Sequence, residues 1–247
     1  MRIATPALAV YLMAGEDLPE HAAAAVEAGA TMIEFGIPYS DPLADGPVIQ
    51  RAAEAALAAG MTPPRCLEVL ARAREAIGET PLVPMTYAAI VERYGVARFC
   101  SDAGAAGATG LIVVDVPPEE AVELSETAAG SGVDLVQLVA LTSRDERIAR
   151  ACATSRGFVY VVSAIGTTGA RAALDVERLR GLLTRVRTHA GELPLLCGFG
   201  VSQPEQVREL RAAGADGVVV GSAAISALEQ GGTAGLAAFV RSLAAAL

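Results

Sequence analysis

One short pattern recurs four times along the chain and restricts its fold more than any other feature. It occurs at residues 28–36 (AGATMIEFG), 106–115 (AGATGLIVVD), 131–140 (SGVDLVQLVA) and 213–222 (AGADGVVVGS). In each copy a helical segment ends at a glycine, small or polar residues follow, and a short apolar run begins. The glycine is typical of a helix C-terminus, and the run is typical of a strand buried on both faces. The pattern therefore predicts alternating strands and helices.

Four further apolar runs, at 8–12, 82–86, 158–163 and 194–198, bring the expected strands to eight. Helices are expected at roughly 18–29, 47–59, 63–77, 94–106, 118–130, 144–154, 175–189, 203–213 and 233–246. A (β/α)₈ TIM barrel has about 250 residues, so we expect one such α/β domain over residues 1–247. An open doubly wound sheet would give the same alternation, but its GxGxxG fingerprint after the first strand is missing.

The overall charge and hydropathy exclude several kinds of partner. The formal net charge of −9 argues against nucleic acid or an anionic membrane surface. No apolar run approaches the length of about 18 residues that a membrane-spanning helix requires. The N-terminal segment has one arginine and only a short apolar stretch, unlike a signal peptide. We therefore expect a cytoplasmic protein with no nucleic-acid or membrane partner.

Lysine is absent, so all 19 basic residues are arginine. A Schiff-base aldolase, or an enzyme that holds pyridoxal phosphate through a lysine, is thereby excluded. The only histidines, His21 and His189, have no metal-ligand spacing, and the four cysteines form no CxxC pair. We expect no cofactor and no bound metal. Any cleavage of a carbon–carbon bond would have to use acids and bases.

Glu34 places a charge in the middle of the apolar run TMIEF. It could be an ordinary charged residue on a half-exposed strand. Helices cover the outside of a barrel, however, and side chains fill the inside, so a carboxylate there is costly unless it opens on a pocket. Burial among Met32, Phe35 and Ile37 should raise the pKa of Glu34, which suits a group that gives and takes a proton near neutrality.

The loop that follows reads GIPYSDPLADGPVIQ at 36–50. Asp41 and Asp45, taken singly, could be turn or cap residues. The longer string IEFGIPYSDPLADGPVIQ nevertheless resembles the signature of the tryptophan synthase alpha-subunit family almost residue for residue. The resemblance spans about residue 8 to about residue 228. It continues through MTY (85–87), DVPPEE (115–120), TSRDERI (142–148), GTTGA (166–170), GFGVS (198–202) and GSAAI (221–225).

The resemblance implies an indole-3-glycerol-phosphate lyase and assigns roles to individual residues. Glu34 falls on the general acid/base that protonates the indole C3 atom. Asp45 falls on the carboxylate that accepts a hydrogen bond from the indole N–H and stabilises positive charge there. The substrate-binding residues implied are Tyr160, Tyr87, Ile112, Thr168 and Phe199. Thr168 and Asp115 match residues near loops that close the site.

The implied reaction splits indole-3-glycerol phosphate into indole and glyceraldehyde 3-phosphate. Protonation at C3 makes that carbon tetrahedral and turns the ring into an electron sink, so no lysine is needed. The glyceryl hydroxyl must then lose its proton as the bond breaks, and Glu34 can serve both steps.

Glycine-rich loops after the last three strands are expected to bind the phosphate. The loops after strands seven and eight are the customary phosphate site of this fold, and N–H groups at a helix N-terminus bind phosphate readily. Each glycine alone could simply allow a turn. The candidates are Gly169, Gly198, Gly200, Gly221 and Ser222. The loop that contains Gly169 is small and glycine-rich, as a lid would be, and Arg171 is either a phosphate ligand or a solvated side chain.

The chain departs from the family pattern at positions that concern a protein partner. The helix that usually precedes strand one is missing, and the motif MxYxN reads MTYAA, with Ala89 in place of an asparagine in a loop that faces the beta subunit. A beta subunit is therefore the expected partner, with an altered interface. The alternatives are a standalone lyase that releases indole, a catalytically silent subunit that activates a partner, and a sugar-phosphate isomerase or epimerase. The last usually needs a catalytic lysine or metal-binding histidines.

Overall fold

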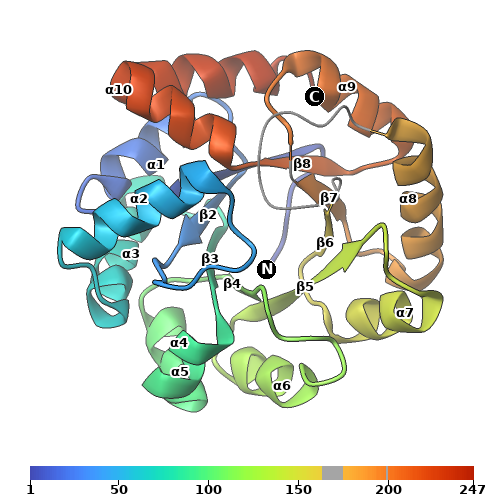
Figure 1. The fold of residues 1–247 in the computed structure, drawn as a ribbon, viewed down its shortest axis with the longest axis horizontal. Helices are drawn as coiled ribbons and strands as arrows, with labels where there is room; N and C mark the ends of the chain where they lie inside the picture. The colour runs from blue at the N-terminus through green and yellow to red at the C-terminus, as the bar shows by residue number, and fades with distance from the viewer. Residues whose placement is uncertain (163–174, 199) are drawn as a thin grey trace.

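A closed barrel of parallel strands forms the centre of the computed structural model, which describes residues 1–162, 175–198 and 200–247 (Figure 1). Within these residues eight strands pair in sequence order, and β8 closes on β1. The strands are β1 (Ala7–Met13), β2 (Met32–Gly36), β3 (Leu82–Thr86), β4 (Gly110–Val113), β5 (Asp134–Ala140), β6 (Val159–Val162), β7 (Leu195–Gly198) and β8 (Gly217–Val220). The predicted TIM barrel is confirmed.

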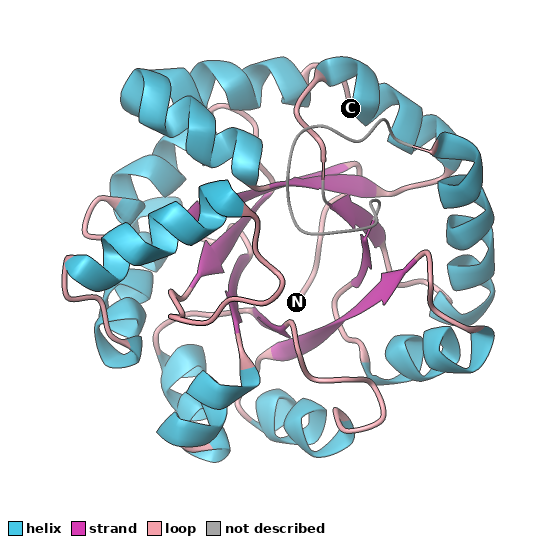
Figure 2. Ribbon diagram, in the orientation of Figure 1, coloured by secondary structure: helices cyan, strands magenta, loops and turns pink. Residues whose placement is uncertain are grey.

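Helices surround the barrel on its outer side (Figure 2). In the described residues they are α1 (Leu18–Glu27), α2 (Pro47–Ala58), α3 (Pro63–Ile77), α4 (Ala88–Tyr94), α5 (Val96–Ala105), α6 (Val122–Gly130), α7 (Asp145–Thr154), α8 (Val176–Ala190), α9 (Pro204–Ala213) and α10 (Ser222–Ala244). None of these helices is both long and apolar enough to cross a membrane. Residues 1–6 form no helix ahead of β1.

Two helical predictions need correction, and glycine explains both. The helix predicted at 94–106 is preceded by a separate helix, α4, because Gly95 adopts a φ of 95° that interrupts the helical path. The sequence also predicts a short helix at 223–229 (AAISALE), and this helix and the one predicted at 233–246 are continuous in α10, which begins at Ser222. It contains a kink at Gly232, where φ is 59°, so two helical segments follow one another with almost no connecting loop.

The strands divide their side chains between two cores. Alternate residues face the helices or the barrel axis, as the two-residue period of a strand requires. The inward-facing cluster comprises Ala7, Ala9, Met32, Val83, Ile112, Val136, Phe158, Tyr160, Leu196 and Val219. The barrel interior is therefore packed with side chains, and open space can exist only at its ends.

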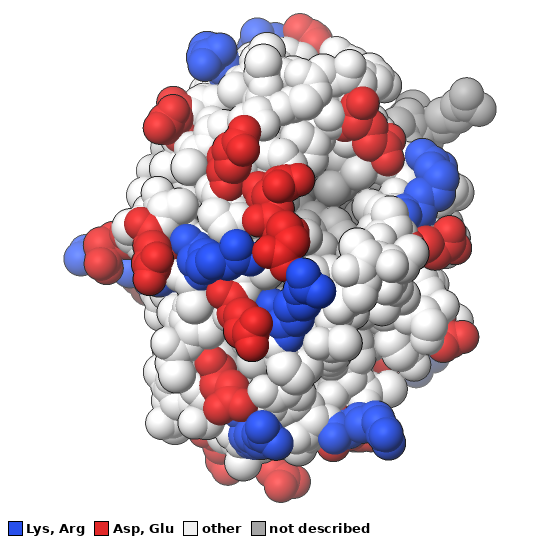
Figure 3. All heavy atoms as spheres, turned by 90° about the vertical axis from the view of Figure 1, so that its left-hand side faces the viewer, with Lys and Arg blue, Asp and Glu red and all other residues white. Residues whose placement is uncertain are grey.

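The outer surface mixes charges of both signs. Figure 3 views the side of the barrel that carries α2 and α3, where acidic and basic side chains are interspersed. Glu16, for example, forms ion pairs of 2.7 Å with both Arg65 and Arg72. Such exposed pairs add little to stability individually, so the barrel depends mainly on its two apolar cores.

Barrel closure depends on small residues where β8 meets β1. Gly217 pairs with Ala7 in the register of these strands. A Cβ atom on Gly217 would lie 2.5 Å from the carbonyl oxygen of Ala7 and 2.6 Å from its Cβ. Since both neighbouring atoms belong to a rigid strand, they cannot move aside at low cost.

We expect Gly217→Ala to lower the free energy of unfolding by about 1–3 kcal/mol, the usual cost of overpacking. The matched control is Gly181→Ala in the exposed part of α8, where a Cβ would meet nothing within 4 Å. That substitution should raise stability by about 0.5–1 kcal/mol, because alanine favours a helix. Urea denaturation of both variants measures the two effects; equal effects would contradict the packing argument.

Candidate active site

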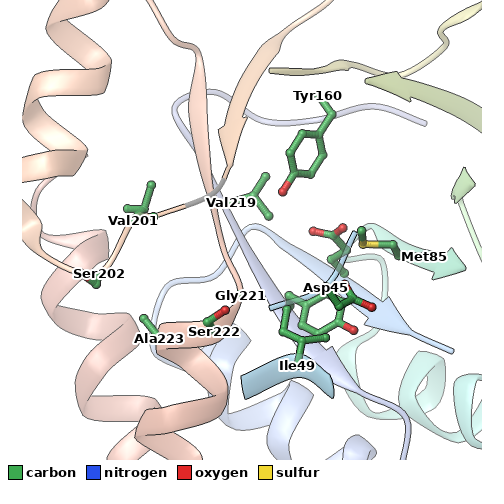
Figure 4. Close-up of a pocket in the computed structure, with 13 residues that line it drawn as sticks. Asp45, Ile49, Met85, Tyr160, Val201, Ser202, Val219, Gly221, Ser222 and Ala223 are labelled. Atoms are coloured by element: carbon green, nitrogen blue, oxygen red, sulfur yellow. The ribbon is translucent and has the colours of Figure 1, made fainter. Parts of the chain in front are cut away.

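A pocket opens at the carboxyl ends of the strands, inside the ring of loops (Figure 4). Its walls come from β1, β2, β3, β6 and β8, from the loops after β2, β7 and β8, and from the first turns of α2 and α10. The lining residues are Tyr11, Glu34, Asp45, Ile49, Met85, Tyr160, Gly200, Val201, Ser202, Val219, Gly221, Ser222 and Ala223. Figure 4 shows Asp45, Met85 and Tyr160 on one side, and Ser222, Ala223 and Ser202 on the other.

Glu34 projects inward from β2 and is only 1% exposed. Its Oε1 atom is buried and has no hydrogen-bond partner in the described part of the chain. Burial, together with the negative charge of Asp45, raises the pKa of Glu34 to about 8. Glu34 therefore holds its proton at neutral pH and can act as an acid.

The surroundings of Glu34 differ in detail from those expected. Met32 shares its inward face and packs in the barrel interior, whereas Phe35 and Ile37 belong to the outer core beneath the helices. The expectation that all three bury the carboxyl group was therefore wrong for two of them. The two-residue period of the strand sends Phe35 to the opposite face from Glu34.

Asp45 lies in the loop between β2 and α2 and is 8% exposed. Its Oδ2 atom accepts a hydrogen bond of 3.0 Å from the Tyr87 hydroxyl. Its backbone carbonyl accepts another, of 2.8 Å, from Gln50 Nε2. Burial raises the pKa of Asp45, and the hydrogen bond from Tyr87 opposes that rise. Asp45 is thus held in position by contacts from Tyr87, which follows β3, and from Gln50 of α2.

Tyr87 contacts the loop that carries Asp45 and is not among the described residues that line the pocket. Its hydroxyl accepts a hydrogen bond of 3.2 Å from the Ala44 N–H and donates to Asp45. The ring of Tyr39 packs against it, with centroids 4.9 Å apart. In the described structure Tyr87 therefore orients a carboxylate, whereas the sequence suggested direct contact with an indole ring.

Two tyrosines line the pocket, and each lies over a glycine of the next strand. A side chain at Gly36 would overlap the phenol of Tyr11, and one at Gly198 would overlap the phenol of Tyr160. Both glycines face inward at the ends of their strands. Gly198 thus has a packing role beside Tyr160, while its predicted role in phosphate binding stays a prediction.

The opposite side of the pocket contains the first turn of α10. Gly221 and Ser222 line the pocket at that N-terminus, and Gly200 lines it with a φ of 79°. The first N–H groups of a helix have no acceptor within it, so they are available to an anion. The described lining contains no arginine.

Several predicted residues lie elsewhere. Ile112 is fully buried in the barrel interior and does not line the pocket. Asp115 accepts a 2.7 Å hydrogen bond from the N–H of Ala88 and so caps α4, and Ala89 is exposed in the first turn of that helix. The predictions for Thr168, Gly169, Arg171 and Phe199 fall outside the described residues.

Sequence reasoning missed several lining residues, most notably Tyr11 and Met85. Both occur near the ends of apolar runs, where they look like ordinary core residues. Strand periodicity offered a signal, because inward residues alternate and the last one before a loop must border the pocket. Val201, Ser202 and Ala223 could not be found in this way, since they lie in or beside loops.

Comparison with known proteins identifies the family that this chain resembles along most of its length. A family model described as "Tryptophan synthase alpha chain" matches residues 2–245. The tryptophan synthase alpha chain of Prochlorococcus marinus is 47% identical over 223 residues, which cover 89% of this chain and 80% of that protein. That of Gluconacetobacter diazotrophicus is 50% identical over 202 residues, 82% of this chain and 73% of that one. A solved structure of Mycobacterium tuberculosis tryptophan synthase is 39% identical, with a TM-score of 0.89, and covers 98% of this chain and 92% of its own.

The raised pKa of Glu34 predicts a pH-dependent stability. The folded protein keeps this proton up to a pH of about 8, whereas the unfolded chain releases it near the ordinary value of 4.5. The wild type therefore loses stability as the pH rises through this window. We expect the free energy of unfolding of Glu34→Gln, relative to wild type, to rise by up to about 1.4 kcal/mol per pH unit there.

Urea denaturation between pH 5 and pH 8 measures this difference. Glu27→Gln, on the exposed face of α1, is the control and should run parallel to the wild type. A constant difference between Glu34→Gln and the wild type would show that Glu34 is ionised in the folded protein.

Proposed function

Since the chain belongs to the tryptophan synthase alpha chain family, we propose that Glu34 and Asp45 carry out its reaction in the pocket described above. The protein is a lyase that cleaves indole-3-glycerol phosphate into indole and glyceraldehyde 3-phosphate. The observation that carries the assignment of roles is the buried carboxyl group of Glu34, whose Oε1 atom has no hydrogen-bond partner among the described residues, in the same pocket as Asp45.

Glu34 supplies the proton that starts the reaction. Because its pKa is about 8, it is a neutral acid near pH 7 and can protonate the indole C3 atom. The ring then becomes a cation, with its positive charge shared by the nitrogen. Asp45, held by Tyr87, accepts the indole N–H and stabilises that charge.

The second step uses the carboxylate that the first step leaves behind. Glu34 removes the proton from the hydroxyl on the carbon next to the ring. The electron pair of that O–H bond forms the aldehyde, and the pair of the breaking carbon–carbon bond returns to the indole ring. Indole and glyceraldehyde 3-phosphate result, and Glu34 has regained its proton for the next turnover.

The N-terminus of α10 is the proposed phosphate site. Gly221 and Ser222 supply N–H groups and a hydroxyl there, and Gly200 and Ser202 face them from the loop after β7. The positive end of the helix dipole favours a dianion even without a nearby lysine. The substrate would then extend across the pocket, with phosphate at α10 and indole near Asp45.

Tryptophan synthase alpha chains pair with a beta subunit. For this chain we propose that the beta subunit covers the mouth of the pocket, where the loop after β2 and the start of α4 meet. Leu43 in that loop is 85% exposed. Ala89, two residues after Tyr87 in the first turn of α4, is exposed as well. A partner that buries Leu43 would also order the loop that contains Asp45.

Indole release from indole-3-glycerol phosphate, measured with and without a beta subunit, tests this function. We expect Glu34→Gln to reduce turnover by about 10²–10⁴-fold, the usual contribution of a general acid/base, while substrate binding is retained. Glu27→Gln is the charge-matched control on the protein surface. A Glu34→Gln variant with more than about a tenth of wild-type turnover would overturn the assignment.

The phosphate site predicts an effect of charge at Ser222. Aspartate at the start of a helix is favourable for folding but would repel a bound phosphate. Ser222→Asp should therefore raise KM for the substrate by about tenfold or more, as for a lost interaction of about 1.4 kcal/mol. Ser222→Asn, with nearly the same shape and no charge, should change KM far less. Equal values of KM for the two variants would place the phosphate elsewhere.

A further inference from the structure

Tyr11 is a buried phenol that lines the same pocket as Glu34 and Asp45. It has no role in the proposed acid–base steps. It projects inward from β1 and is 5% exposed. Tyr11 lines the pocket, and its hydroxyl forms no hydrogen bond with another described residue. The hydroxyl is not one of the fully buried side-chain atoms without a partner among the described residues, so it stays accessible from the pocket and can donate a hydrogen bond there at another stage.

The strand register sets Tyr11 next to Glu34. Their Cα atoms are partners in the β1–β2 pairing, and both side chains face the barrel axis. The Tyr11 ring lies over Gly36, the next inward position after Glu34 on β2, and only glycine leaves it that room. The hydroxyl therefore lies on the pocket side of the Glu34 carboxyl group, where the substrate must enter.

The proposed reaction requires a hydrogen-bond donor close to the Glu34 carboxyl group. In the resting protein at neutral pH, Glu34 keeps its proton, and its Oε1 atom has no hydrogen-bond partner among the described residues. Once Glu34 has protonated the indole C3 atom, a carboxylate exists in a buried site until it takes the proton of the glyceryl hydroxyl. A buried carboxylate without a donor is costly, and one hydrogen bond from a hydroxyl stabilises it strongly.

We propose that Tyr11 is a positioning residue of the acid–base cycle: its hydroxyl donates a hydrogen bond to the Glu34 carboxylate in the interval when Glu34 has given up its proton. Tyr11 keeps its own proton throughout. The proton that leaves Glu34 goes to C3, and the proton that returns comes from the substrate hydroxyl. This inference rests on the proposed function and adds a residue to it.

The charges around Tyr11 are compatible with this role. Asp45 and Glu34 face it from β2 and the loop beyond, and Tyr87 faces it from the end of β3. Tyr160 on β6 lines the same pocket, and the described lining contains no arginine or histidine. Burial first, and then the fields of Asp45 and Glu34, hold the pKa of Tyr11 well above its ordinary value. The phenol therefore stays protonated and acts only as a donor.

Tyr11→Phe removes the donor and keeps the ring. Turnover requires protonated Glu34, so the wild-type rate should fall as the pH rises through about 8. A hydrogen bond to the charged form lowers a carboxyl pKa, and its loss raises that pKa. In Tyr11→Phe we expect the alkaline limb of kcat/KM to move up by about one pH unit, and kcat at neutral pH to fall about tenfold with KM nearly unchanged.

Tyr94→Phe is the matched control. Tyr94 lies at the end of α4, outside the pocket, and its phenol hydroxyl donates a hydrogen bond to Asp102 of α5. The pH profile of Tyr94→Phe should equal that of the wild type. A second readout needs no activity: the pH dependence of unfolding attributed to Glu34 should extend to higher pH in Tyr11→Phe.

The possible outcomes distinguish a failure of the proposed role of Tyr11 from a failure of the proposed lyase function. If the wild type releases no indole, with or without a beta subunit, the proposed function fails. If the wild type is active and Tyr11→Phe loses activity without a shift of the alkaline limb or of the unfolding profile, Tyr11 only fills space and the inference is overturned. A shift in both profiles, absent in Tyr94→Phe, supports the hydrogen bond to Glu34.

Discussion

The interior of a closed eight-stranded barrel has a fixed width, so each inward side chain takes its space from another. Alanine and glycine meet where β8 joins β1, and the middle of the barrel is filled with apolar residues. Near the carboxyl ends, Tyr11 and Tyr160 each lie over a glycine of the neighbouring strand. Glu34 lines the same pocket and is only 1% exposed, so water solvates its charge poorly.

Desolvation of Glu34 then connects structure with chemistry. A carboxyl group in water would be ionised near neutrality and could not donate a proton, whereas this one, with a pKa of about 8, can. Asp45 occupies the same pocket but has a hydrogen bond from Tyr87 that favours its charged form. Two carboxyl groups in one pocket are thus prepared for different tasks by their neighbours, one as an acid and the other as a counter-charge.

Much of this could be predicted from the sequence, and the rest could not for physical reasons. The four glycine-to-strand junctions and the apolar runs predicted the barrel, because glycine and period-two patterns act locally. Glu34 could be singled out since a charge in a doubly buried strand needs an explanation. The position of Tyr87 behind Asp45, and of Tyr11 over Gly36, depends on how neighbouring strands are staggered. That register arises from the closed barrel as a whole, and so no local pattern contains it.

The central claim is that Glu34 is a neutral acid in the folded protein, and an infrared titration tests it most directly. The difference spectrum between the wild type and Glu34→Gln isolates the band of this one carboxyl group. The account predicts the C=O band of a protonated carboxyl group at pH 6–7, replaced by carboxylate bands as the pH passes about 8. Carboxylate bands throughout pH 6–8 would show that Glu34 is already ionised, and would contradict its role as the acid that begins the reaction.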